Sequence, residues 1–198
     1  MSRHNYVLRS EPTELTFFDT LRVALDLIKD QYGLEFKYAF FEEGANDLGR
    51  HVYWETGKQA ILSLVEDLAT PVRYLIIEAA TPEEVERLGG WLEDLLPVIS
   101  LEELQEEARQ KMMDDPQTLV RMAIGTGKLS DPASLEILRN GLQSNDDLVR
   151  FRAAAAASLT QWPDFLQDLN PMSQNDPSPE VQEMARRAVE ACQRSVPT

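Results

Sequence analysis

The feature that most constrains this chain is a repeated pattern in its second half. The segment 147–156 aligns with the segment 179–188 at an offset of 32 positions. Val149, Ala153 and Ala156 of the first copy match Val181, Ala185 and Ala188 of the second. A weaker copy begins at residue 119, 29 positions before Leu148. A period of this size is typical of helical units that bury a core only by stacking on one another.

An acidic turn, a Val-Arg pair and an alanine run follow one another over residues 145–157. This order resembles the second helix of HEAT repeats, including bacterial HEAT-like variants related to the phycobilisome lyase subunits. The resemblance covers residues 114–195, and Gln182 departs from the Arg that the family usually has there. It implies a stack of antiparallel helix pairs that binds proteins. Since barely three repeats are present, we expect one end to be capped, either by the acidic connector and the N-terminal layer or by a partner.

Capping residues followed by proline divide the second half into short helices. The three pairs are Asp115-Pro116, Asp131-Pro132 and Ser178-Pro179. Such pairs favour helix starts, because the side chain accepts a free N–H and the first turn tolerates proline. No strand pattern occurs from residue 114 onward, so we predict an all-α segment. Before it, a capping box at 100–103 opens a very acidic helix that we interpret as a connector.

The first 98 residues alternate between the helical period and the strand period. Helical spacing of apolar residues predicts helices over 18–32 and 61–68, and a capping box at 81–84 opens another. Strand patterns cover residues 6–8, 34–40, 51–54 and 73–79, with a turn at 42–49 that makes the middle two a hairpin.

These patterns predict an α+β domain over residues 1–98, an acidic connecting helix over 99–113 and an all-α, HEAT-like repeat domain over 114–198. The expected element order of the first domain, β-α-β-β-α-β-α, matches the split βαβ pattern of a ferredoxin-like layer with an added helix. We therefore expect a sheet-and-helix layer of that kind.

The chain is strongly acidic, with a formal net charge of −15. Residues 1–113 hold 11 basic and 22 acidic side chains, and residues 114–198 hold 8 and 12. Both halves repel phosphate groups, which argues against nucleic acids and anionic membranes as partners. A basic or amphipathic protein is the partner that this charge favours, and a homodimer stays open.

Two further observations concern the compartment. Cys192 is the one cysteine of the chain and cannot form an internal disulfide. The first 15 residues lack the apolar stretch of a signal peptide, and no apolar run is long enough to span a bilayer. We expect a cytoplasmic protein.

Cys192 and the run 125–129 resemble functional sites, but a structural role explains each of them better. Cys192 falls on the apolar face of a predicted helix, so we expect a buried thiol rather than a reactive pair with His51. The run 125–129 looks like a phosphate-binding loop, but Met122 and Leu129 occupy positions that such a loop reserves for Gly and for Ser or Thr. We interpret it as a turn between helices.

The remaining candidates are polar and aromatic. Arg150 is expected to pair with an Asp of the adjacent turn, the alternative being that it lines a concave binding surface together with Arg152. Glu42, Glu43, Asn46 and Asp47 offer oxygens for a hard cation, although we expect a solvated turn. Phe41, Tyr53 and Trp54 form either an exposed aromatic patch or part of the core.

No residue set in the sequence points to a catalytic, cofactor-binding or metal site. The function that we predict is a non-catalytic protein–protein interaction scaffold. The resemblance alone suggests an alternative, a lyase-like or chaperone-like factor acting on a chromophore or cofactor protein. A second alternative is an acidic, immunity-type inhibitor of a basic toxin, because high acidity suits a basic target.

Overall fold

The computed structural model describes residues 1–198 except 12–13, 44–48, 58–59, 69 and 195–198. Two compact units make up the chain, residues 1–99 and residues 100–198. The first unit contains a five-stranded antiparallel sheet with helices, and the second contains helices joined by turns, with no strand among its described residues. The predicted fold class, an α+β part followed by an all-α repeat, is confirmed.

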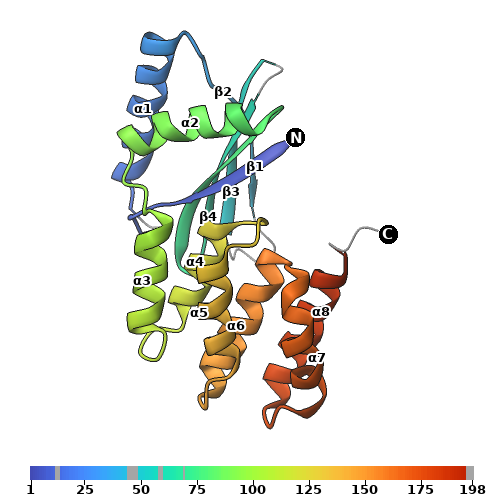
Figure 1. Ribbon diagram of the computed structural model, residues 1–198. Helices are drawn as coiled ribbons and strands as arrows, with labels where there is room; N and C mark the ends of the chain where they lie inside the picture. Colours follow the sequence, from blue (N-terminus) through green and yellow to red (C-terminus); the bar gives the residue numbers. More distant parts are fainter. Residues whose placement is uncertain (12–13, 44–48, 58–59, 69, 195–198) are drawn as a thin grey trace. The chain divides into compact units, whose positions relative to one another are not determined.

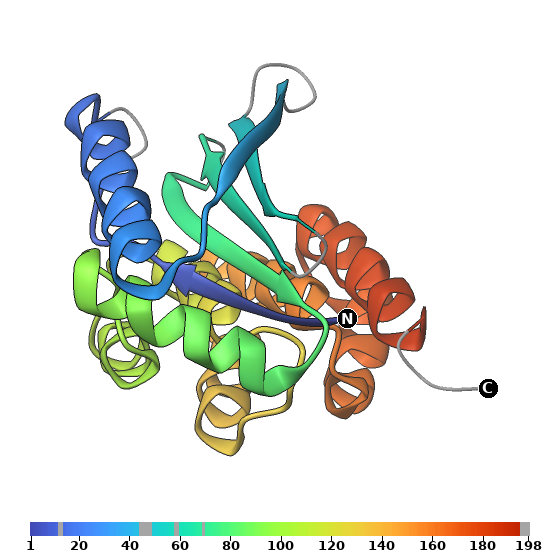
Figure 2. The same ribbon diagram turned by 90° about the horizontal axis from the view of Figure 1, so that it is seen from above.

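The first unit places two helices on one face of its sheet (Figure 1, Figure 2). Its elements are β1 (Ser2–Val7), α1 (Thr16–Tyr32), β2 (Lys37–Glu43), β3 (Gly49–Thr56), β4 (Ala60–Asp67), β5 (Val72–Ala79) and α2 (Pro82–Leu95). The strand order is β1-β5-β4-β3-β2, and every neighbouring pair is antiparallel. β1 and β2 are therefore the edge strands.

Apolar residues at helical spacing fix both helices to the sheet. Ile28 of α1 and Leu92 of α2 are almost fully buried in a core that includes Leu62 of β4. α1 ends at Gly33, which adopts the left-handed conformation (φ 69°) and donates its N–H to the Lys29 carbonyl. Glycine reaches this conformation at little cost, which explains why the helix stops there.

The prediction of a helix over residues 61–68 is wrong, because residues 61–67 belong to β4. β4 lies between β3 and β5 and carries apolar side chains on both faces, such as Ile61 on one and Leu62 on the other. Apolar residues on both faces remove the period-two signal, and the remaining spacing imitates a helix. The predicted ferredoxin-like strand order is therefore also wrong. Strands β2 to β5 form an antiparallel meander, and β1 lies at the end of the sheet beside β5.

A buried ion cluster joins three strands of this unit. Glu66 and Arg73 are 1% and 0% exposed, and Arg73 Nε donates to Glu66 Oε1 at 2.8 Å. Arg50 donates to the other carboxylate oxygen. The Arg73 guanidinium also lies 4.4 Å from the centre of the Phe17 ring. A charged pair with this degree of burial needs both partners, because removing one leaves an uncompensated charge.

The second unit consists of three helix pairs, α3/α4, α5/α6 and α7/α8 (Figure 1). The elements are α3 (Leu101–Lys111), α4 (Gln117–Thr126), α5 (Pro132–Leu142), α6 (Asp147–Thr160), the short helix η2 (Pro163–Phe165), α7 (Leu166–Asn175) and α8 (Pro179–Arg194). The second helices of the pairs pack in series, α4 on α6 and α6 on α8.

Small residues allow these second helices to approach closely. Ala153, Ala154, Ala156 and Ala157 of α6 are fully buried. The acidic segment 99–113 contains α3, which packs against α4 and α5 through buried residues such as Leu104. Both halves of the capping box predicted at Ser100 are formed.

None of the helices in the described part of the chain has the length and apolar character needed to cross a membrane.

Candidate protein-binding surface of the helical repeat

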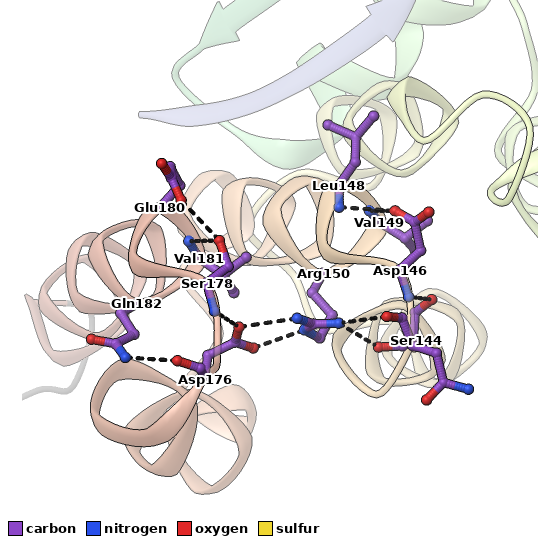
Figure 3. A network of polar contacts seen from close by, with 11 residues as sticks. Ser144, Asp146, Leu148, Val149, Arg150, Asp176, Ser178, Glu180, Val181 and Gln182 are labelled. Carbon is purple, nitrogen blue, oxygen red and sulfur yellow. Dashed lines mark hydrogen bonds and ion pairs between the residues drawn. The ribbon is translucent and has the colours of Figure 1, made fainter.

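A bidentate ion pair links the turns of two successive repeats (Figure 3). Arg150 of α6 donates from Nε to Asp176 Oδ2 at 2.7 Å and from Nη2 to Asp176 Oδ1 at 3.0 Å. Its Nη1 donates to the carbonyl oxygens of Ser144 and Asn145 at 2.9 and 3.1 Å. Asp176 lies in the turn before α8, so the pair links two successive repeats. The predicted pairing of Arg150 with an Asp of the adjacent turn is confirmed.

The residues aligned with Arg150 in the other two copies do not form this pair with a following repeat. Arg121 and Gln182 align with Arg150. The residue six positions earlier is Asp in the first and third copies and Ser144 in the second. Ser144 offers no carboxylate to Arg121, which binds Asp115 of its own repeat at 2.9 Å instead. Gln182, in the last described repeat, donates to the Asp176 carbonyl at 2.6 Å.

Hydrogen bonding keeps Asp176 ionised. The pKa of its carboxyl group is lowered, first by the hydrogen bond from Arg150 and then by the backbone N–H of Ser178, which outweigh the effect of burial. The two side chains are 5% and 11% exposed. This geometry defines a structural link between repeats rather than a free cation for a ligand.

Cys192 is a core residue, as the sequence predicted. Its side chain is fully buried, and its thiol lies 3.8 Å from the Ala157 carbonyl oxygen. Burial raises the pKa of the thiol to about 11, so the thiol is neutral at physiological pH.

The segment 125–129 comprises the last two residues of α4 and the start of the connection to α5. Gly127 follows the end of α4 with a positive φ of 72°. The prediction of a turn between helices is confirmed.

An open groove of about 350 Å³ lies between α6 and α8. Its lining residues are Phe151 of α6 and Pro179, Glu180, Glu183, Met184 and Arg187 of α8. Phe151 and Met184 supply apolar surface, and Glu180 supplies a carboxylate that also accepts from the Ser178 hydroxyl. Arg187 Nε donates to Glu183 Oε1 at 3.0 Å, an exposed pair that an incoming charged group can replace at little cost. Such a surface can take the apolar side of a peptide segment.

The groove lies beside a stripe of exposed residues on α6. Leu148 and Leu159 are 51% and 44% exposed, and their spacing places them on one side of the helix together with Arg152. In Figure 3, Leu148 and Glu180 lie on one side of the helices, and the pair of Arg150 with Asp176 lies on the other. The link between repeats and the exposed apolar surface therefore occupy different sides of the array.

The structure separates the three aromatic residues for which an exposed patch and core packing were the alternatives, and Trp54 packs against the core. Phe41 is opposite Val52 and shares the helix-covered face of the sheet with Trp54, whereas Tyr53 lies on the other face and stacks on Phe40 at 4.3 Å. Of the four candidate oxygen ligands of the hairpin turn, Asn46 and Asp47 lie outside the described residues. The described residues contain no group of three or more His, Cys, Asp or Glu side chains suited to a metal ion.

Residues 101–190 match the family model of HEAT repeats. No curated protein and no solved structure matches the chain. The match supports the resemblance predicted for the C-terminal half, and it begins at Leu101, the first residue of α3. HEAT repeats generally mediate protein–protein interactions, which supports the scaffold class.

Phe151 and Met184 were not singled out from the sequence. Phe151 is the one large apolar residue between two arginines, and Met184 aligns with Arg152 in the repeat. For Phe151, an apolar residue between two charged ones is the signal that could have located the groove, whereas Met184 falls at the helical spacing of the apolar face that carries Cys192.

Proposed function

We propose that this protein is a non-catalytic adaptor that binds a basic or amphipathic protein segment in the groove between α6 and α8. The observation that carries the proposal is the apolar surface that the half-buried Phe151 and Met184 contribute to an open groove of the HEAT-like array. This apolar surface suits the apolar side of the partner, and the carboxylates of the lining suit its charges.

The charge of the whole chain supports the same partner. A net charge of −15 attracts a cationic protein over long distances and increases the association rate, an effect that salt reduces. We propose a cytoplasmic location, because the chain carries one buried cysteine.

We further propose that the two compact units are two domains with a boundary at residues 99–100, so that nearly all of the acidic segment 99–113 belongs to the second domain. α3, within this segment, packs on the helices that follow it, so it would also close the first end of the array. Such a terminal helix meets the need of a short repeat for a cap.

Affinity capture from the native lysate tests the proposed function. Full-length protein is compared with two variants, Met184→Glu in the groove and Leu129→Glu in the α4–α5 turn, where the side chain is 85% exposed. We expect one stoichiometric protein to be retained by the wild type and by Leu129→Glu at low salt, and to be lost with Met184→Glu and at high salt. Equal retention by both variants would refute the groove, and a blank capture would refute the adaptor role. Circular dichroism confirms that the variants fold.

A further inference from the structure

β2 presents an open edge with exposed apolar side chains. It is the last strand of the sheet and pairs only with β3 among the described strands. Tyr38, Phe40 and Phe41 are 62%, 48% and 43% exposed. An edge of this kind can accept another strand, because its outer N–H and C=O groups have no partner strand in the sheet.

The register of β2 with β3 shows which side chains share a face. Lys37 is opposite Glu55 and Glu42 is opposite His51, so Lys37 and Glu42 lie on one face of the sheet. Tyr38 and Phe41 lie on the other face, opposite Trp54 and Val52. An irregularity between Tyr38 and Phe40 adds one residue, Ala39, to β2. Without it, Lys37 and Glu42 would lie on opposite faces, since their separation is odd.

We propose that β2 pairs antiparallel with β2 of a second copy of this chain, with the two-fold axis between Ala39 and Phe40. This register sets Lys37 opposite Glu42 of the second copy, and Tyr38 opposite Phe41 of the second copy. Both pairs are compatible with the faces described above, and the symmetry forms each of them twice. The proposal goes beyond the binding role of the helical repeat and is independent of it.

Charge complementarity favours a second copy as the occupant. The strand carries Lys37 at its start and Glu42 and Glu43 at its end, so only antiparallel pairing brings its basic end to its acidic end. Opposite charges that face each other across strands stabilise the pair, whereas like charges destabilise it. The inserted residue is then the feature that aligns the charges, in addition to its usual effect of bending an edge.

A charge swap in the full-length chain tests the proposal by sedimentation equilibrium at physiological salt. We expect a dimer for the wild type, and dissociation constants raised at least about tenfold for Lys37→Glu and for Glu42→Lys, because each change sets two like-charge pairs across the axis. The double variant K37E/E42K restores opposite charges and should dimerise like the wild type.

The outcomes that would overturn the proposal are distinct. A wild type that stays monomeric up to millimolar concentration would leave the edge to another protein or to solvent. A dimer that neither single variant weakens would place the interface elsewhere. Met184→Glu serves as the matched control, since it alters the groove and should leave dimerisation unchanged.

Discussion

Replacing Asp176 with Ala should destabilise the helical repeat by about 3 kcal/mol. Breaking one side of a buried pair costs about 3–5 kcal/mol because it leaves the other charge uncompensated. Asp176 and Arg150 are 5% and 11% exposed, which places the pair close to that limit. Arg150 keeps its hydrogen bonds to the carbonyls of Ser144 and Asn145, so we expect the lower end of the range. The matched control Glu136→Ala removes an exposed carboxylate and should cost less than about 0.5 kcal/mol.

Urea unfolding followed by the fluorescence of Trp162 measures this effect in the repeat itself. Trp162 is 2% exposed, donates its indole N–H to the Lys128 carbonyl at 3.0 Å, and is the one tryptophan of residues 100–198. A Trp54→Phe, Trp91→Phe background removes the signal of the first unit. The free energy of unfolding falls by about 1–3 kcal/mol per M of urea, so the urea concentration at the midpoint of unfolding should fall by about 1–3 M. A loss no larger than that of Glu136→Ala would refute the reasoning.

The pH dependence gives a second check on the same pair. The hydrogen bond from Arg150 lowers the pKa of Asp176 below its ordinary value of 3.8. The stabilisation is therefore fully present above pH 3.8 and is lost as the pH falls through the lowered pKa of the folded state. The stability difference between wild type and Asp176→Ala should stay constant down to this range and then shrink. A difference that already shrinks near neutral pH would contradict the assignment.

Three further predictions concern other parts of the chain. Glu66→Gln leaves the buried guanidinium beside it without its carboxylate and should lower the free energy of unfolding by about 3–5 kcal/mol, measured by urea titration. Gly90→Ala meets no atom within 4 Å and should stabilise α2 by about 0.5–1 kcal/mol. Gly89→Ala places a methyl group against the buried Tyr6 ring and hydroxyl and should destabilise α2; thermal melts of both variants measure the two effects. Cys192, with its pKa raised to about 11 by burial, should react with a thiol reagent at pH 8 only after unfolding; a fast native reaction would contradict its burial.

The helical half could be predicted from the sequence because its signals are local and repeat. The capping pair at Asp131 and the matched Val and Ala positions fix where helices start and which sides they bury. The sequence predicts that Arg150 contacts the carboxylate of an Asp in an adjacent turn. Its identity as Asp176 depends on how successive repeats stack, which the sequence alone does not specify.

The sheet was harder to predict for a physical reason. A central strand such as β4 is apolar on both faces, so periodicity cannot separate it from a helix, and that one error changed the expected topology. The face on which Phe41 lies, relative to Tyr53 of β3, depends on the extra residue in β2, a feature of strand register that has no sequence signature. The groove was missed because its apolar residues come from two repeats and meet only in the folded array.

Hydrogen–deuterium exchange of the full-length chain, with and without the protein that it captures, tests the proposed binding surface most directly. The proposed function predicts slower exchange in residues 148–159 of α6 and 179–187 of α8 when the partner is bound, and no such change for the Met184→Glu variant. Protection confined to residues 1–99 would contradict it, because binding would then occur on the sheet unit instead of the HEAT repeat.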